Sequence, residues 1–362
     1  MRLTFPALAL LALALSACTA ASPAASPTAA PAATSAAQPS GTSSALRKLS
    51  IVLPNLSFYA VPVTLAQNKG YFADEGYDVE ITTTGSGSKA VAALLGGSAD
   101  VGVMEFSDLI GAVEQHQPVQ VFAAIVTEPN ISIALKKSIA DASGLSDQSP
   151  IDDKLKALKG KKIAISSPGS GTDTSLRWAL LKVGLDPDRD VEIVPSGSAS
   201  NELAAFAQGQ VDAFAQTSPW IEQAIAKNNG FMVVSFPRGD VPEQHGRLAF
   251  ALATFKDAMD KKPEVFTGAT RAVWRALKLI HDQPEDAKSV AKQALFQDVD
   301  NDVYDTAWKI NLPSFPADPR ITEQQVQLTL DFKQRVTGAP SSVTFDQIAT
   351  NRFVDAGAPT MH

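Results

Sequence analysis

A helix ends and a strand begins within the stretch Ala66-Gln67-Asn68-Lys69-Gly70-Tyr71-Phe72-Ala73-Asp74-Glu75-Gly76-Tyr77-Asp78-Val79-Glu80. We expect the helix to run from about Val61 to Asn68 and to stop at Gly70, because glycine is favoured just past the C-terminus of a helix. The strand is expected from Tyr77 to Thr82. This helix-to-strand step is the unit from which most of the chain is built.

The same alternation continues on both sides of this stretch. We predict strands at residues 49–53, 77–82, 100–104 and 119–126, with helices at 61–68, 85–95 and 107–115. The pattern then restarts, with strands at 131–135, 162–166, 191–194, 211–215 and 231–235 and helices at 172–183, 201–208 and 219–227. Beyond Phe250 the chain is predicted to be helical, and apolar residues at helical spacing between 265 and 280 indicate one long helix with a buried face. The pattern predicts an α/β fold of two lobes, each a mainly parallel sheet flanked by helices, with a helical C-terminal part.

The N-terminus reads as a leader followed by a tether. Arg2 and an apolar run too short to span a membrane precede Leu15-Ser16-Ala17-Cys18, which resembles a bacterial lipobox. This resemblance implies that the mature chain begins at Cys18 and is lipid-anchored on the extracytoplasmic face of the cell membrane, on its periplasmic or extracellular side; the alternative is an ordinary secretory signal. Thr19 to Leu46 is almost entirely Ala, Ser, Pro, Thr and Gly, which predicts a disordered spacer.

Together these patterns predict how the chain is divided. We expect a signal peptide at 1–17, a tether at 18–46, a first lobe at 47–127, a second lobe at 128–247, and a return to the first lobe with the helical region at 248–362. The net charge of −7 and the pI near 5.2, without a sizeable Lys/Arg cluster, argue against a nucleic-acid partner. No apolar run after the leader is long enough for a membrane helix, which argues against a channel or permease.

Several short motifs occur in the order found in one family. They are Pro54 to Ala60, the quoted stretch 66–80, Gly85-Ser86-Gly87-Ser88, Gly96 to Val103, Leu158 to Ala164, Ser167 to Thr172 and Phe206 to Ala213. Together they resemble the ABC-importer solute-binding proteins of the sulfonate/nitrate/thiamine-precursor class, over roughly Arg47 to Leu279. The resemblance implies a type II periplasmic-binding-protein fold, a small molecule held between two lobes, permease and ATPase subunits as partners, and a monomer.

Two Gly/Ser loops, one per lobe, lie between a strand and a helix. A helix start offers unpaired N–H groups, and glycine lets a ligand approach the backbone. The alternative is plain helix capping by Ser88 and Thr172. Aromatic residues near strand ends add apolar walls, Trp220 first among them, whereas Phe58 and Phe106 can equally be core. The ligand-binding residues we predict are Asn55, Ser57, Tyr59, Ser86, Gly87, Ser88, Glu105, Thr127, Ser167, Ser170, Gly171, Thr172, Thr217 and Trp220.

Glu105 departs from the resemblance. The sulfonate and nitrate binders carry small neutral residues after this strand, and a carboxylate in the cleft would repel an anion. It would accept hydrogen bonds from an amine or an aminopyrimidine. The alternative places Glu105 on the surface, beside the start of the next helix. Glu105 therefore favours a donor-rich organic ligand over a sulfonate, taurine or nitrate.

Enzyme motifs are weak in this sequence. It has no Gly-x-Ser-x-Gly elbow and no phosphate-binding loop of the Gly-x-x-x-x-Gly-Lys-[Ser/Thr] type. The four histidines are scattered, so we expect no metal site, no cofactor and no catalytic residue. Two enzymes on the same fold, a yeast-type pyrimidine synthase and porphobilinogen deaminase, depend on cysteine, and the single cysteine here is Cys18. A secreted enzyme and a structural lipoprotein remain the alternatives outside transport.

Overall fold

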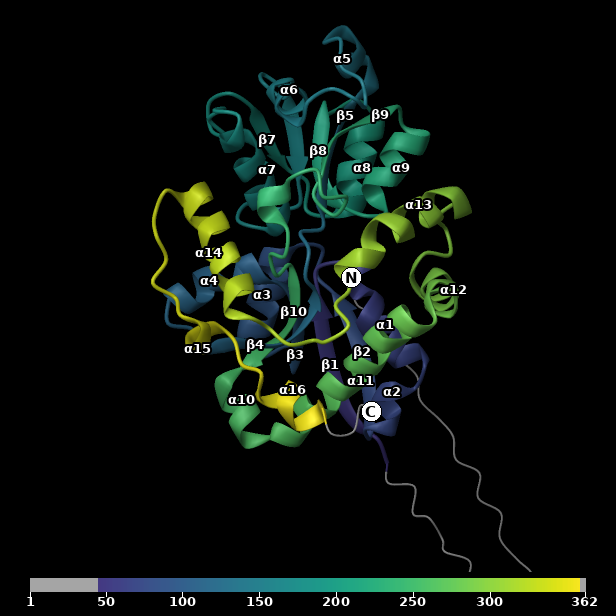
Figure 1. Ribbon diagram of the computed structural model, residues 1–362, viewed down its shortest axis with the longest axis vertical. Coiled ribbons are helices and arrows are strands. Elements are labelled where there is room, and N and C mark those ends of the chain that lie inside the picture. The colour runs from purple at the N-terminus through teal and green to yellow at the C-terminus, as the bar shows by residue number, and fades with distance from the viewer. Residues whose placement is uncertain (1–44, 359–362) are drawn as a thin grey trace, which may run out of the picture. The chain divides into compact units, whose positions relative to one another are not determined.

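The computed structural model describes residues 45–358. Over that range the chain forms two five-stranded sheets, each flanked by helices (Figure 1). The predicted signal peptide, the lipobox at Cys18 and nearly all of the predicted tether lie outside the described residues. Within the described part, no helix combines the length and the apolar content needed to cross a membrane.

The first sheet has the strand order β2-β1-β3-β10-β4. Its members are β1 (Arg47–Leu53), β2 (Tyr77–Thr83), β3 (Val101–Glu105), β4 (Val119–Val126) and β10 (Phe250–Phe255). β10 lies antiparallel between β3 and β4, with Phe250 opposite Glu105. The prediction that the chain is helical beyond Phe250 is therefore wrong for this segment. Six residues of Phe-Ala-Leu-Ala-Thr-Phe are too short and too apolar for periodicity to separate a buried strand from a buried helix.

The second sheet repeats this arrangement with the order β7-β6-β8-β5-β9. Its strands are β5 (Ile131–Lys136), β6 (Lys162–Ile165), β7 (Glu192–Pro195), β8 (Ala213–Thr217) and β9 (Gly230–Ser235). β5 pairs antiparallel with both β8 and β9, while β6 pairs parallel with β7 and β8. Each sheet thus has one strand that runs against the other four. The predicted pair of mainly parallel sheets is confirmed.

Helices cover the sheets. Those between strands are the short η1 (Phe58–Ala60), α1 (Val61–Asn68), α2 (Tyr71–Asp74), α3 (Gly87–Leu95), α4 (Phe106–Glu114), α5 (Lys137–Ala142), α6 (Ile151–Lys156), α7 (Gly171–Lys182), α8 (Ala199–Ala207), α9 (Trp220–Lys227) and η2 (Pro242–Gln244). After β10 come α10 (Lys256–Lys261), α11 (Pro263–Asp282), α12 (Pro284–Leu295), α13 (Asn301–Asn311), η3 (Leu312–Ser314), α14 (Glu323–Thr337), α15 (Phe345–Ile348) and α16 (Arg352–Gly357). α11 buries Phe266, Ala269, Val273 and Leu277 on one face, as their helical spacing predicted.

The chain passes between the sheets twice. It leaves the first sheet after Val126 and returns to it at Phe250. α14 contacts elements of both lobes, since it packs against α4 and α7. Lys333 of α14 forms an ion pair with Glu114 (3.2 Å), and the Phe332 ring stacks on Trp178 at 6.2 Å between centroids. The sequence allows Phe58 and Phe106 to lie either in the core or at the cleft. In the structure both are buried in hydrophobic clusters.

Candidate functional site

Loops from the two sheets meet around a cavity of about 30 Å³. Nine of the predicted ligand-binding residues line it: Asn55, Tyr59, Ser86, Gly87, Glu105, Ser170, Gly171, Thr172 and Thr217. The other lining residues are Pro54, Asp108, Ile131, Ser166, Gln216 and Phe250. Because this volume is about that of one water molecule, a solute larger than water can enter only when the lobes open.

Hydrogen bonds between the lobes hold the cavity shut. Ser57 and Thr217 share a bond between their hydroxyls (2.6 Å), and the Ser57 hydroxyl also donates to the Ser218 carbonyl (2.6 Å). On the opposite loops, Ser88 donates to the Pro168 carbonyl at 3.1 Å. The Ser167 hydroxyl lies 3.3 Å from that of Ser88. Ser57, Ser88 and Ser167 therefore join the lobes beside the cavity and do not line it.

One glycine allows this close approach, and a second leaves room for a side chain of its own lobe. A Cβ atom on Gly171, in the second lobe, would lie 2.9 Å from Cγ of Glu105 in the first. A Cβ on Gly87 would collide with the Asp108 carboxylate. Neither glycine has a positive φ, so the backbone conformation does not require glycine. Glycine is needed because a side chain would collide with its neighbours.

The Gly/Ser loops begin α3 and α7, but the predicted capping residues are wrong. The N-caps are Ser86 and Ser170, each two residues before the predicted Ser88 and Thr172, and neither cap side chain accepts from a backbone amide of its helix. Thr172 instead accepts from the Ser166 amide (3.0 Å) and bonds the Ser170 hydroxyl (2.9 Å). The capping interpretation failed because the helices start at the glycines. Both helix starts thus keep backbone donors at the cavity.

Tyr59 forms the aromatic wall of the cavity. Its ring stacks on Phe250 at 3.9 Å with an angle of 3° between the planes. Its hydroxyl accepts from the Asn55 amide (2.9 Å) and donates to the Asn55 carbonyl (2.8 Å). Burial raises the pKa of Tyr59 well above its ordinary value, so the hydroxyl stays neutral. The wall is rigid as well as apolar.

Thr127 and Trp220 lie away from the cavity lining. Thr127 is half-buried where the chain leaves the first sheet, and its amide donates to Ser314 (2.9 Å). Trp220 is half-buried at the first position of α9. Its indole nitrogen is buried without a partner among residues 45–358. Trp220, which we expect first among the aromatic residues that wall the cleft, therefore does not line this cavity, whereas Tyr59 does.

Glu105 is buried at the cavity, with 3% of its surface exposed, so the interpretation that places it on the surface is wrong. Its Oε1 accepts from Nη1 of Arg247 at 3.1 Å. Arg247 is itself 1% exposed, and its guanidinium lies 4.1 Å from the ring centroid of Phe332 in α14. Burial raises the pKa of Glu105, and the charge and hydrogen bond of Arg247 oppose that rise. Glu105 is thus part of a buried ion pair and less repulsive to an anion than a lone carboxylate.

Asp108 and Gln216 line the cavity and were missed by sequence reasoning. Both carboxylate oxygens of Asp108 are buried without a hydrogen-bond partner among the described residues. Burial, reinforced by the neighbouring Glu105, raises the Asp108 pKa well above its ordinary value. Gln216 donates to the buried Glu202 (3.1 Å) and accepts from the Thr217 amide (2.9 Å). Asp108 looks from sequence like a first-turn acid of α4, a common helix-stabilising position that gives no signal of a site.

The polar atoms left without a protein partner define the chemistry of the cavity. Apart from the Ser86 hydroxyl they are acceptors: Asn55 Oδ1, Glu105 Oε2 and both oxygens of Asp108. Buried polar atoms normally have a partner, so these favour a solute that donates hydrogen bonds. The starts of α3 and α7 favour a carbonyl or an anionic group on the same solute. In residues 45–358 no group of three or more His, Cys, Asp or Glu side chains is placed to hold a metal ion.

Comparison with known proteins gives a consistent result. The model of the NMT1-like family matches residues 56–295. YtlA of Bacillus subtilis (strain 168), named as a binding protein, is 23% identical over 86% of this chain and 90% of its own length. The nitrate/nitrite binding protein NrtA of Synechocystis is 23% identical over 64% of this chain, a match that spans about half (53%) of NrtA. The alkanesulfonate-binding protein SsuA of Xanthomonas axonopodis pv. citri superposes with a TM-score of 0.67 and 17% identity, over 85% of this chain and 100% of that one.

Proposed function

Because the chain belongs to the NMT1-like family and its two lobes meet on a small polar cavity, we propose that it is the solute-binding component of an ABC importer. The observation that carries the proposal is that one cavity is lined by residues of both lobes, Glu105 and Tyr59 from the first and Thr172 and Thr217 from the second. A solute in this position contacts both lobes only when they are closed. Its binding therefore shifts an open–closed equilibrium, and the closed form is the one that a permease and its ATPase would receive.

The ligand we favour is a small organic molecule that donates hydrogen bonds, such as an aminopyrimidine or a similar vitamin precursor. The unpartnered oxygens of Glu105 and Asp108 support this choice. A sulfonate, taurine or nitrate is the second candidate, supported by the names of NrtA and SsuA. The ion pair with Arg247 reduces the repulsion between Glu105 and an anion, and this supports the second candidate.

The site we propose consists of the residues that line the cavity together with Ser57, Ser88 and Ser167, which join the lobes beside it. The lobes would turn about the two connecting segments, at 127–130 and 236–249. We assign no catalytic role to these residues, since no nucleophile is paired with a base among them. The lipid anchor at Cys18 and the extracytoplasmic location also belong to this proposal, and they rest on the lipobox resemblance in the sequence.

Calorimetric titration against a ligand panel tests the proposal. The panel contains hydroxymethylpyrimidine-type compounds, riboflavin, taurine, an alkanesulfonate and nitrate, each added to the wild-type protein. We expect one donor-rich organic compound to bind at a stoichiometry of one, and small-angle scattering to report a more compact protein on its addition. Tight binding of nitrate or a sulfonate would replace the ligand assignment. A solute that binds without compaction would contradict the closure mechanism.

A further inference from the structure

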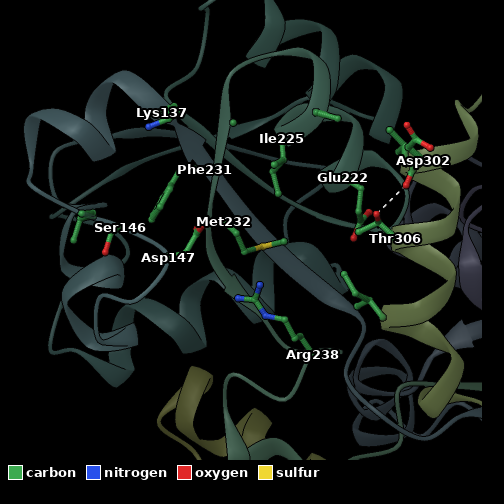
Figure 2. A pocket seen from close by; sticks show the side chains of 15 residues that line it. Lys137, Ser146, Asp147, Glu222, Ile225, Phe231, Met232, Arg238, Asp302 and Thr306 are labelled. Atoms are coloured by element: carbon green, nitrogen blue, oxygen red, sulfur yellow. Dashed lines mark hydrogen bonds between the residues drawn. The ribbon is translucent and has the colours of Figure 1, made fainter.

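A second cavity, of about 750 Å³, lies where α9 and β9 of the second lobe face α13, a helix whose Tyr304 and Trp308 pack in the core of the first lobe (Figure 2). It shares no lining residue with the cavity between the lobes. Its size is within the range of small-molecule sites, about 300–1,000 Å³. The proposed solute-binding function makes no use of it.

One side of this cavity is apolar. Ile225 comes from α9, Phe231 and Met232 come from β9, and Val303 and Ile310 come from the facing helix α13. Figure 2 shows Ile225, Phe231 and Met232 projecting from neighbouring segments of the second lobe. These side chains would cover the hydrocarbon body of a ligand.

The charges around the cavity leave an excess of acid. Its two cations are already paired with aspartates outside the lining, Lys137 with Asp141 (2.5 Å) and Arg238 with Asp240 (2.6 Å). Glu222 is 5% exposed, and its Oε1 accepts from the Ser218 hydroxyl at 2.9 Å. Its Oε2 is buried and has no partner among the described residues. In Figure 2 the Glu222 carboxylate lies toward Thr306 and Asp302 of α13.

We propose that this cavity binds a small organic amine, with its ammonium group on Glu222 and its apolar body against Ile225, Phe231 and Met232. A buried carboxylate oxygen without a partner is costly, and an ammonium donor would satisfy it once the Glu222 side chain turns its Oε2 into the cavity. Asp302 of α13 adds negative charge at the same end of the cavity. A neutral molecule of the same shape would gain the apolar contacts but would leave Glu222 unsatisfied.

The test compares two probes of nearly equal shape, phenethylammonium chloride and 2-phenylethanol, by calorimetry at pH 8. This pH lies above the pKa of about 7 that burial gives Glu222. We expect the ammonium compound to bind at least about tenfold more tightly than the alcohol, as a charged hydrogen bond implies. Glu222→Gln should remove that preference and leave the alcohol unchanged.

Two further variants locate the site. Ile225→Trp narrows the apolar side of the cavity and should weaken binding of both probes, which keeps the test decisive if Glu222→Gln folds poorly. Thermal melts establish that each variant is folded. Asp108→Asn alters only the cavity between the lobes and should leave ammonium binding unchanged. The proposal is overturned by equal affinity for the two probes, by loss of ammonium binding in Asp108→Asn but not in Glu222→Gln, or by no saturable binding at millimolar amine.

Discussion

The Asp108 carboxylate has no hydrogen-bond partner among the described residues, so its replacement tests what the solute supplies. Asp108→Asn keeps the shape and substitutes a donor for one acceptor oxygen. A donor-rich ligand should then bind about 1–3 kcal/mol more weakly, whereas an anion should bind equally well or better. Calorimetric titration of the two proteins with the same ligand measures the difference. A donor-rich ligand that binds both proteins equally would place Asp108 outside the recognition of the solute.

Glu105→Gln is harder to interpret than Asp108→Asn, because it also changes an ion pair. It removes the carboxylate that pairs with the buried Arg247 guanidinium at 3.1 Å, so it should lower stability by about 3 kcal/mol. If that variant bound the solute more weakly, the loss of the ion pair and the changed contact with the solute could not be separated as causes. Asp108→Asn lacks this complication, because Asp108 forms no ion pair or hydrogen bond with another side chain in residues 45–358.

Glu222 makes stability depend on pH. Burial raises its pKa from 4.5 to about 7, so between these values the folded protein holds a proton that the unfolded chain has released. The free energy of unfolding therefore falls as pH rises through this window, by at most about 3 kcal/mol for this group. The free energy of unfolding of Glu222→Gln, relative to that of the wild-type protein, should therefore increase from pH 4.5 to pH 8. Urea unfolding of both proteins at these two pH values measures the change. Other buried carboxyls affect both proteins alike, so a constant difference would mean that Glu222 keeps an ordinary pKa.

At the residue scale, position after a strand was enough to suggest Glu105, Tyr59 and Thr217. The same reasoning missed Arg247, because its partner Glu105 lies 142 residues away and nothing near Arg247 in the sequence suggests a site. Asp108 was missed for a different reason. A first-turn acid has an ordinary explanation on any helix, and nothing in the sequence shows that the start of α3 packs against this one.

Among the elements, the start of α7 is where closure can be tested. The Cβ of Gly171→Ala would meet Glu105 Cγ at 2.9 Å only when the lobes are together. We expect the solute to bind about 1–3 kcal/mol more weakly, the usual cost of overpacking, with no loss of melting temperature in the absence of solute. Calorimetry and thermal melts measure the two effects.

Gly111→Ala in α4 is the matched control. Its Cβ would meet only the flexible end of Lys333, at 3.3 Å, so neither affinity nor closure should change. If Gly171→Ala bound the solute as tightly as this control, the lobes would not need the close approach seen here. If it melted earlier than wild type without solute, the glycine would serve the fold of its own lobe.

Strands and helices with clear periods were predictable, and α1 and β4 have the predicted ends. β10 was not predictable, because only its pairing with other strands shows that this apolar segment is a buried strand and not a buried helix. Those partners, β3 and β4, are more than a hundred residues earlier in the chain. The starts of α3 and α7 were displaced by one residue or more, which changed the capping residues but left the loops at the cavity.

For the whole molecule, the repeated alternation of strands and helices predicted two mainly parallel sheets. It contained no information on how tightly the lobes meet. The small cavity depends on hydroxyl contacts such as Ser57 with Thr217, which join segments 160 residues apart. Such contacts depend on the arrangement of complete lobes and leave no local pattern in the sequence.

The position of β10 also sets an order of events during synthesis. β3 and β4 are not neighbours in the first sheet, and the strand that joins them is made only at Phe250–Phe255. By then every strand of the second sheet, from Ile131 to Ser235, has already been synthesised. Since the N-terminal half of the first lobe must wait for its missing strand, the later-made second lobe is the one able to fold first. The first lobe, although it begins the chain, is completed last.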